Sequence, residues 1–503
     1  MKPINVGLLG IGTVGGGTFE VLARNQQEIK RRAGRGIVIK VVADKDLKRA
    51  RKLVGKSAVV TDDAFKVVTD PGIDIVVELI GGTTIAKQLI MAAIENGKHV
   101  VTANKALLAT CGNEIFAAAQ KHNVMVAFEA AVAGGIPIIK ALREGLTANR
   151  IEWIAGIING TSNFILSEMR DKGSSFDTVL KEAQRLGYAE SDPTFDIEGI
   201  DAAHKLTIIA AISFGIPMRF KDAYTEGISK LAAADIRYAE ELGYRIKLLG
   251  ITRRTAGGIE LRVHPTLIPT RRLIANVEGV MNAILVKGDA VGATLYYGAG
   301  AGSYPTASAV IADLVDVTRM HTADPEHRVP HLAFQPDQLS NAPILAIAEV
   351  KTSYYLRLRV HDRPGVLADV TRILADSGIS IDAMVQKEPS EGEKQVDIIM
   401  LTHVTIEKSV NAAIARIEKL PVVLGKVTRI RMEQLDAPWC LDTQVLLCSN
   451  RLASSSALSL ILAIATAIAA VRFARLTRED DSRHVRKLMC RDTSRGTRAH
   501  ALR

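Results

Sequence analysis

The chain has few cysteines and few aromatic residues for its length. Aromatic side chains make up 4% of its 503 residues, and its four cysteines are Cys111, Cys440, Cys448 and Cys490. Their spacing matches neither a metal-binding motif nor a disulfide framework, so it favours a reducing cytoplasm. The N-terminus shows no cleavage signature of a signal peptide, because Lys2 is followed by a strand-like pattern. We therefore expect a cytoplasmic protein.

The positive charge of the chain is unevenly distributed. The formal net charge is +10, of which about +6 lies after residue 436. Elsewhere no basic stripe is interleaved with aromatic residues, so the sequence gives little support to a nucleic-acid partner. A length of about 500 residues is instead typical of a soluble enzyme with about three domains.

An apolar run from Ile4 to Leu9 leads directly into a glycine-rich turn and then a helical pattern. The turn reads Gly10-Ile-Gly12-Thr13-Val14-Gly15. Such glycines allow a tight strand-to-helix turn, close approach of a pyrophosphate and close packing of the helix on the strand. The turn therefore predicts a dinucleotide-binding site, and the alternative is a glycine-rich turn without a ligand.

The second predicted strand, 37–43, ends at Asp44, and several cations follow it. An acidic residue at this place accepts hydrogen bonds from the ribose of NAD, whereas the 2′-phosphate of NADP needs a cation. The cations are Lys45, Lys48, Arg49 and Arg51. We therefore expect NADP to be accepted and NAD not to be excluded; the alternative is that the cations form a solvated helix face.

Further strands at 73–80 and 99–102 alternate with helical patterns, which predicts a doubly wound α/β sheet over residues 1–136. Lys105 follows the second of these strands at the carboxyl end, where open α/β sheets bind ligands. It can therefore reach a bound substrate, although a surface lysine is the alternative. The stretch from Glu129 to Pro137 is rich in small residues and predicts a tight turn that presents its carbonyl groups.

The segment from Ala183 to Lys205 carries the chemistry of a predicted α+β second domain, 137–320. A helix ends at Gly187, and a new helix begins near Asp201 with Lys205 on the same face. Alone, such a pair is an ordinary helix-stabilising contact. The loop gathers four acidic residues, namely Glu190, Asp192, Asp196 and Asp201. This pattern predicts recognition of a substrate ammonium or hydroxyl group, with Lys205 handling the proton.

This segment resembles, without a gap, the signature of homoserine dehydrogenases. The resemblance covers about residues 1–433 and includes the glycine-rich turn, Thr102 to Lys105, Glu129 to Pro137, Asn159 to Phe164, and Gly298 to Ser308. It implies NAD(P)-dependent interconversion of L-homoserine and L-aspartate 4-semialdehyde, on the branch toward threonine and methionine. It also implies a homo-oligomer, as a dimer or a tetramer.

Carried over residue by residue, the resemblance makes Lys205 the acid/base group. Lys105 would contact the cofactor and the substrate, and a share in proton transfer is left open. Glu190 would bind homoserine, while Asp196 and Asp201 would support the substrate and Lys205.

The resemblance also implies two sites on glycine-rich loops. Gly302 lies where the family closes a loop on the cofactor. A sodium ion would bind the loop residues Glu129, Val132, Gly134 and Ile136.

A third module, 352–432, follows a linker and return segment at 321–351. Its predicted order of βαββαβ resembles an ACT domain, the small amino-acid-sensing module. The Arg363-Pro-Gly365 turn presents N–H groups at a helix start, which suits the carboxylate of an amino acid. We expect threonine to bind there and inhibit; the alternative is that the module serves only as a dimerisation surface.

The last stretch, 437–503, fits neither the enzyme nor the ACT pattern. Residues 452–471 carry no charge and could span a bilayer, with Arg472, Arg475 and Arg478 after them. Serine, threonine and alanine dilute this stretch, so we favour a poorly ordered extension over an anchor and expect no membrane partner.

Two other functions compete with the dehydrogenase interpretation. One is a catalytically silent sensor of amino acids and nucleotides, against which the intact Lys105, Glu190, Asp201 and Lys205 argue. The other is aldehyde oxidation through a thioester on Cys111, for which the sequence offers no identifiable histidine partner.

Overall fold

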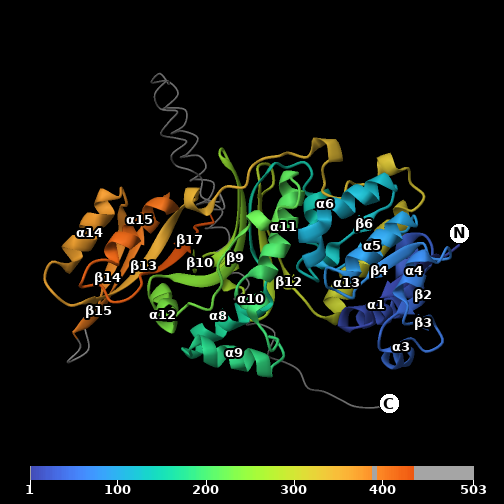
Figure 1. The fold of residues 1–503 in the computed structure, drawn as a ribbon, viewed down its shortest axis with the longest axis horizontal. Helices are drawn as coiled ribbons and strands as arrows, with labels where there is room; N and C mark the ends of the chain where they lie inside the picture. The colour runs from blue at the N-terminus through green and yellow to red at the C-terminus, as the bar shows by residue number, and fades with distance from the viewer. Residues whose placement is uncertain (1, 388–393, 436–503) are drawn as a thin grey trace, which may run out of the picture. The chain divides into compact units, whose positions relative to one another are not determined.

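The structure is a computed structural model that describes residues 2–387 and 394–435. These residues belong to one compact unit and form two β-sheets with helices packed against them (Figure 1). In the described residues, no helix combines the length and the apolar character needed to cross a membrane. The apolar stretch 452–471 lies outside the described residues.

The first sheet is a parallel sheet of the doubly wound type, as predicted. Its strands are β1 (Ile4–Leu9), β2 (Ile37–Ala43), β3 (Val59–Thr61), β4 (Ile75–Glu78), β5 (His99–Thr102) and β6 (Val126–Ala127). Their order is β3-β2-β1-β4-β5-β6, so the direction of winding changes between β1 and β4. The apolar runs of β1 and β4 are buried because helices cover both faces of such a sheet. Ligands bind at the carboxyl ends of the strands near this change.

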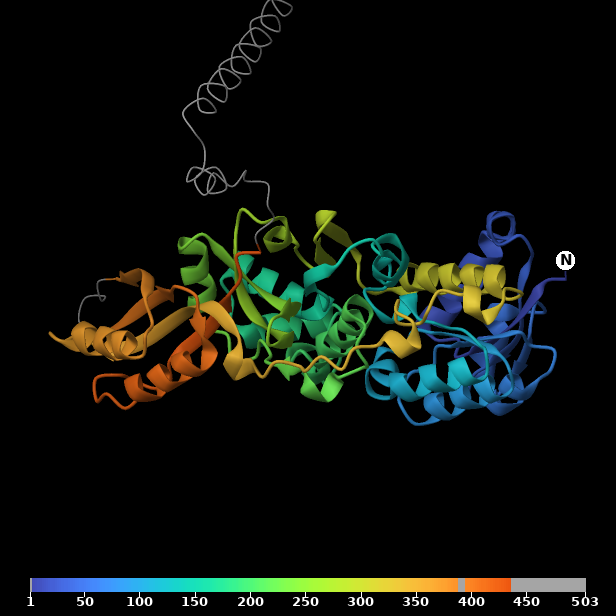
Figure 2. The same cartoon turned by 90° about the horizontal axis from the view of Figure 1, so that it is seen from above.

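The helices around this sheet come from two distant parts of the chain. They are α1 (Thr13–Arg24), α2 (Gln26–Ala33), α3 (Leu47–Val54), α4 (Ala64–Thr69), α5 (Ile85–Glu95), α6 (Lys105–Lys121) and α13 (Ser303–Met320). Helix α13 lies along α1, as Figure 2 shows. Their approach is so close that a Cβ on Gly17 would lie 2.4 Å from Ser303 Oγ. The chain therefore returns to the nucleotide-binding part within the segment predicted as the second domain.

The second sheet has strands from the substrate part and from the ACT module. The substrate part contributes β7 (Ile151–Ile157), β8 (Tyr224–Thr225), β9 (Tyr244–Thr255), β10 (Gly258–Pro269), β11 (Met281–Gly288) and β12 (Gly292–Ala299). The ACT module contributes β13 (Lys351–His361), β14 (Ile381–Gln386), β15 (Gln395–Thr402), β16 (Thr405–Ile406) and β17 (Thr428–Met432). The main order is β12-β11-β7-β9-β10-β17-β13-β15-β14. Parallel pairing of β10 with β17 makes the sheet continuous, which the sequence analysis did not predict.

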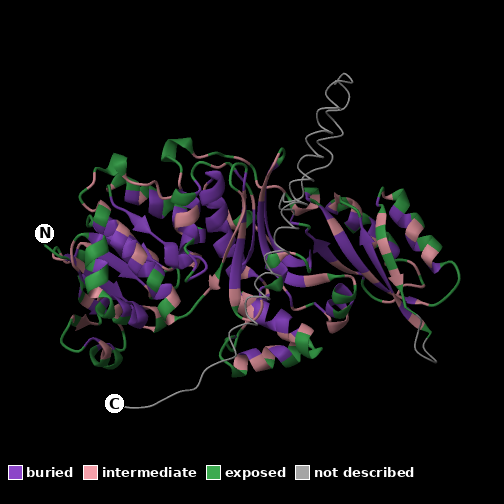
Figure 3. Ribbon diagram, turned by 180° about the vertical axis from the view of Figure 1, so that it is seen from behind, coloured by how far each residue is buried: buried purple, intermediate pink, exposed green. Residues whose placement is uncertain are grey.

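Helix α11 (Ile200–Phe214) connects the two sheets. It packs against β9 and β10 on one side and against α6 on the other, and almost all of its residues are buried (Figures 1 and 3). The remaining helices of this part are α7 (Ile138–Lys140), α8 (Gly160–Lys172), α9 (Phe176–Arg185), α10 (Thr194–Ile197), α12 (Ala233–Glu241), α14 (Val366–Asp376) and α15 (Glu407–Ile417). The position of α11 brings its first turn next to the start of α6, and α6 follows β5 of the nucleotide-binding sheet.

Candidate active site

Three of the predicted site residues form one ion cluster at the start of α11. The carboxylate of Asp201 lies 2.6 Å from Lys205 Nζ and 3.2 Å from Lys105 Nζ. Lys205 also donates a hydrogen bond of 2.8 Å to the carbonyl of Ile158. Asp201 and Lys205 are 4% and 8% exposed, whereas Lys105 begins α6 and is partly exposed. Side chains from α11 and α6 therefore meet at one carboxylate.

Burial and the two ammonium groups set the charge state of this cluster. Burial would raise the pKa of Asp201, yet Lys205 and Lys105 lower it to about 2. Burial lowers the pKa of Lys205 below its ordinary value, while Asp201 opposes this change. Asp201 therefore stays ionised, and Lys205 loses its proton more readily than a solvated lysine.

Asn159 is a site residue that the sequence analysis did not single out. Its side-chain amide donates to Asp196 at 2.8 Å and to Asp201 at 2.9 Å. Its oxygen accepts from the backbone N–H of Ser162, so Asn159 caps α8. Helix α8 begins at the next residue, Gly160. An asparagine placed directly after a strand and before Gly-Thr-Ser is the signal that could have identified the cap.

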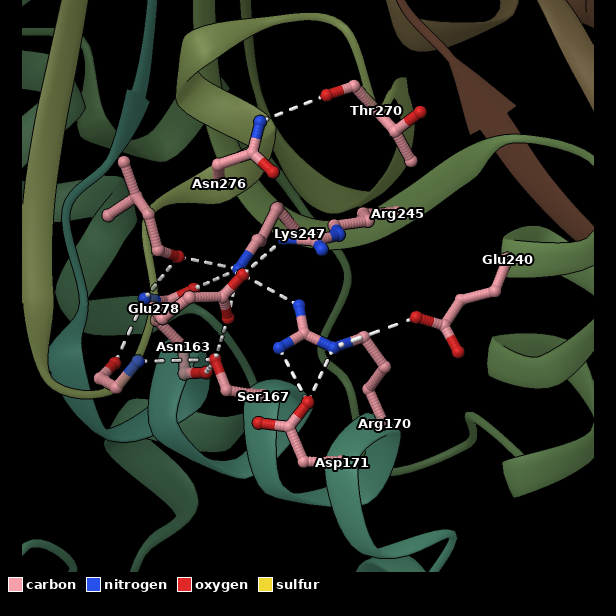
Figure 4. Close-up of polar contacts among 12 residues, drawn as sticks. Asn163, Ser167, Arg170, Asp171, Glu240, Arg245, Lys247, Thr270, Asn276 and Glu278 are labelled. Atoms are coloured by element: carbon pink, nitrogen blue, oxygen red, sulfur yellow. Dashed lines mark hydrogen bonds and ion pairs between the residues drawn. The ribbon is translucent and has the colours of Figure 1, made fainter.

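Asn163 belongs to a second buried polar cluster, which Figure 4 shows. It donates to the carbonyl groups of Val277, Gly279 and Met281. Lys247, 1% exposed, donates to Asn163 at 3.1 Å and to the carbonyl of Val277 at 2.6 Å. Glu278 accepts hydrogen bonds from Ser167, Arg170 and Arg245. This cluster fastens α8 to β9 and to the segment before β11, and so supports the helix that Asn159 caps.

The predicted acidic loop is only partly brought to the ion cluster. Asp196 is joined to Asp201 through Asn159. Glu190 lies on the exposed loop between α9 and α10, where its main-chain carbonyl accepts from Gln184. The carboxylate of Asp192 accepts from the N–H of Thr194 in the same loop. Neither Glu190 nor Asp192 contacts Lys205 in the structure.

The turn between β1 and α1 has the backbone geometry of a pyrophosphate site. Gly10 has φ +90°, and a Cβ on Gly15 would lie 2.0 Å from the carbonyl oxygen of Gly10. A Cβ on Gly12 would meet nothing within 4 Å, so the space in front of this glycine is open. The first turn of α1, which includes Thr13 and Val14, has no acidic side chain. The turn therefore fits an anionic dinucleotide at a helix N-terminus.

The end of β2 and the loop before α13 adjoin the same turn. Asp44 accepts hydrogen bonds from the backbone N–H of Ile11 at 2.7 Å and of Asp46 at 2.8 Å. The cations Lys45 and Arg49 beside it are exposed. Gly302, with φ +129°, is followed by Ser303, whose hydroxyl donates to the carbonyl of Thr13 at 2.8 Å. Asp44 and the loop that contains Gly302 thus adjoin the glycine-rich turn.

The predicted sodium loop surrounds a buried carboxylate. Glu129 accepts hydrogen bonds from the backbone N–H groups of Ile139 and Lys140, at 2.9 and 2.8 Å. Its own N–H donates to Asp313, and burial raises the pKa of both carboxyl groups to about 7. Gly134 packs so tightly that a Cβ would lie 2.6 Å from the carbonyl oxygen of Gly300.

Val132, Gly134 and Ile136 would offer carbonyl oxygens to a cation at this loop. The carbonyl of Ile136 also accepts a hydrogen bond from the N–H of Ile138. No group of three or more His, Cys, Asp or Glu side chains suited to a metal occurs in the described ranges. Oxygen donors beside a buried carboxylate nevertheless suit a hard cation.

The predicted effector turn lies at the start of α14. Gly365, with φ +93°, precedes the helix. A cavity of about 220 Å³ adjoins the turn and is lined by residues that include Asp362, Arg363, Gly365 and Gln386.

Comparison with known proteins identifies all three predicted parts. The family model for the homoserine dehydrogenase NAD-binding domain matches residues 10–129, that for homoserine dehydrogenase matches 137–315, and that for the ACT domain matches 354–422. A homoserine dehydrogenase of Pseudomonas aeruginosa is 64% identical over 436 residues, which cover 87% of this chain and 100% of that protein.

Solved structures agree with these matches. The crystal structure of a homoserine dehydrogenase from Thiobacillus denitrificans is 74% identical, with a TM-score of 0.83, over 87% of this chain and 99% of that one. A hyperthermophilic archaeal homoserine dehydrogenase in complex with NADPH is 27% identical, with a TM-score of 0.55, over 63% of this chain and 98% of that one. The chain therefore belongs to the homoserine dehydrogenase family, the NAD(P)-dependent oxidoreductases that act on a CH–OH group, and it carries an ACT domain.

Proposed function

We propose that this chain interconverts L-homoserine and L-aspartate 4-semialdehyde and that Lys205 transfers the proton. The observation that carries the proposal is the carboxylate of Asp201 held between Lys205 and Lys105, where α11 meets the start of α6. Bound NAD(P) supplies the hydride chemistry. An absorbance assay at the nicotinamide band, with purified protein, homoserine and each cofactor in turn, tests this function. No change in absorbance with either cofactor would contradict it.

Lys205 has the charge and the environment that the reaction needs in both directions. When the aldehyde is reduced, negative charge develops on its oxygen, and the ammonium group of Lys205 stabilises it and donates the proton. When homoserine is oxidised, Lys205 must be neutral to accept the hydroxyl proton, and burial lowers its pKa toward that state. Asp201 orients Nζ, and Asn159 orients Asp201 in turn.

The acidic residues supply recognition of the amino-acid part of the substrate. Asp196 and Asp201 support the substrate beside Lys205, and Glu190 on the neighbouring exposed loop binds the homoserine ammonium. A Glu190→Gln variant is expected to raise KM for homoserine more than it lowers kcat. An unchanged KM would remove Glu190 from the site.

We propose that NADP is accepted and that NAD is not excluded. Lys45 and Arg49 are exposed beside Asp44, where a 2′-phosphate would need positive charge. Replacing Arg49 with Gln is expected to lower kcat/KM for NADP while leaving that for NAD nearly unchanged. An equal loss with both cofactors would contradict this assignment.

We propose further that sodium binds at Glu129, Val132, Gly134 and Ile136. A cation there would offset the negative charge of the buried pair Glu129 and Asp313, whose raised pKa values reflect the cost of ionisation. Sodium is therefore expected to raise the melting temperature more at pH 8 than at pH 6, compared with choline at equal ionic strength. Equal stabilisation by the two cations would contradict the site.

We propose that threonine binds the ACT domain and inhibits the enzyme. We also propose that the protein is a cytoplasmic homo-oligomer. The carboxylate of threonine would face the N–H groups of the Arg363-Pro-Gly365 turn. Titration of activity with threonine tests the effector. If the rate is unchanged at millimolar threonine, the domain serves only as a dimerisation surface.

The thioester alternative has little support, since the Cys111 sulfur contacts the Thr110 hydroxyl rather than a histidine.

A further inference from the structure

We propose that Arg431 and Glu226 are positioning residues for this reaction. Their ion pair lies at the junction of the ACT module and the substrate part. It holds the segment 224–229, against which the Asp196 loop and the start of α11 rest. The proposal rests on the proposed roles of Asp201 and Lys205.

The guanidinium of Arg431 joins three elements of the junction. Arg431 lies on β17 and is 1% exposed. It donates two hydrogen bonds to Glu407, at 2.7 and 2.6 Å, where α15 begins. It donates a third, of 2.8 Å, to Glu226 and a fourth, of 3.1 Å, to the hydroxyl of Tyr224. The bidentate, buried contact with Glu407 fixes both the position and the orientation of the guanidinium.

The segment 224–229 is in turn in direct contact with the Asp196 loop. The N–H of Ile228 donates to the carbonyl of Ile197 at 2.8 Å, and the hydroxyl of Ser229 donates to Glu198 at 2.6 Å. A Cβ on Gly227 would lie 2.4 Å from the carbonyl oxygen of Ile197. No side chain fits between the two segments, so a shift of one moves the other.

The Asp196 loop leads within a few residues to the reaction centre. Ile197 directly follows Asp196, and Gly199, with φ +78°, immediately precedes α11. Asn159 bridges Asp196 to Asp201, which holds Nζ of Lys205. A displacement of about 1 Å in such a constellation can lower a rate by about a hundredfold. The position of Glu226 therefore bears on the carboxylate that orients the proton-transferring lysine.

Side-chain packing alone does not hold the segment in place. A cavity of about 490 Å³ separates residues 226–231 from α15 and the start of β17, and Arg429 and Asn411 line its other side. On this side Glu226 contacts Arg431 at 2.8 Å and the hydroxyl of Tyr224 at 2.7 Å, and its carboxylate lies 3.6 Å from the guanidinium of Arg429. The backbone of the segment is fixed on its other side, where the N–H of Glu226 donates to the carbonyl of Val263. The pair with Arg431 is the shorter of the two ion pairs that orient the Glu226 carboxylate at the cavity, so its loss would loosen the segment on that side.

Kinetics of Glu226→Gln and Arg431→Lys test the proposal. Glu226→Gln removes the charge of the pair, and Arg431→Lys removes the planar fork. Both are expected to raise KM for homoserine and to lower kcat/KM about tenfold, while KM for the cofactor stays unchanged. The pH at which homoserine oxidation reaches half its maximal kcat is expected to shift, because Asp201 no longer orients Lys205. Glu226→Asp, which restores the charge, is expected to recover part of the loss.

Glu433→Gln provides the matched control. Glu433 is a buried carboxylate near the same junction, paired with Arg262 and Arg253, and it does not contact the segment 224–229. This variant is expected to lower the melting temperature while its kinetic constants stay within twofold of the parent. The proposal is overturned if Glu433→Gln gives the same kinetic change. It is also overturned if Glu226→Gln lowers activity only in proportion to its folded fraction, with unchanged KM and pH profile. A loss of turnover in Lys205→Ala tests the proposed function separately.

Discussion

Two lysines of this protein, Lys205 and Lys247, are buried to a similar degree but have different surroundings. Both have a pKa that burial lowers, to about 8 for Lys247. The ammonium group of Lys247 is enclosed by the carbonyl of Val277, the side chain of Asn163 and Glu278. That of Lys205 shares a carboxylate with the partly exposed Lys105, beside the nucleotide-binding sheet. Burial and a lowered pKa are therefore common to both lysines, and what distinguishes the proposed catalytic lysine is the set of groups around its ammonium.

The largest expected effect comes from Lys205→Ala. Loss of the proton-transferring group is expected to lower kcat by about 10²- to 10⁴-fold. Cofactor affinity, measured by quenching of intrinsic fluorescence or by calorimetry, should change little, because Lys205 lies outside the β1–α1 turn. A variant with near-normal turnover would end the assignment of Lys205.

Asn159→Ala is expected to have the second largest effect. The variant loses the bridge between Asp196 and Asp201, so kcat/KM for homoserine should fall about tenfold to a hundredfold. Loss of the helix cap should cost about 1 kcal/mol of unfolding free energy, measured by denaturant titration. Ser175→Ala, which removes the cap of α9, is the matched control and should lose stability alone.

A pH profile of homoserine oxidation further separates the two lysines. The rate is expected to rise from neutral pH through pH 9 as Lys205 loses its proton. A Lys247→Met variant should keep this rise, because Lys247 is enclosed away from the substrate. If the pH profile flattened in Lys247→Met, the assignment of proton transfer to Lys205 would be wrong.

The smallest expected kinetic effect is that of Lys247→Met, which should act on stability. Removal of the ammonium takes the Lys247 donor from the buried side-chain oxygen of Asn163 and a second donor from the carbonyl of Val277, at a cost of about 1–3 kcal/mol at neutral pH. The folded pKa of about 8 lies below the ordinary 10.5, so the unfolded chain binds more protons in this window. Lys247 therefore makes stability rise between about pH 8 and 10.5, and the variant should lose that rise in thermal scans. A parallel curve for parent and variant would contradict the assigned pKa.

The sequence predicted those parts of the site that lie within short stretches of chain. Asp201 and Lys205 are four residues apart on one helix, and Lys105 directly follows a strand, so periodicity and topology indicated where they lie. Their roles were assigned from the family resemblance. The fold class was predicted for the same reason, since its strands and helices alternate in order.

Contacts between distant residues were not predicted. The bridge from Asn159 to Asp196 and Asp201 spans about 40 residues, and no local pattern marks it. The pairing of β10 with β17 joins residues more than 160 positions apart. Glu190 was assigned from the family resemblance, and the structure does not bring it to Lys205.

Strand β17 has a consequence for how the polypeptide reaches its native state. It is inserted between β10 and β13, and it is the last strand of the described chain to be synthesised. Until residues 428–432 leave the ribosome, the facing edges of two long strands lack their shared neighbour. Exposed strand edges promote association between chains. A nascent or truncated polypeptide that ends before this strand is thus expected to aggregate, rather than to yield a free-standing catalyst.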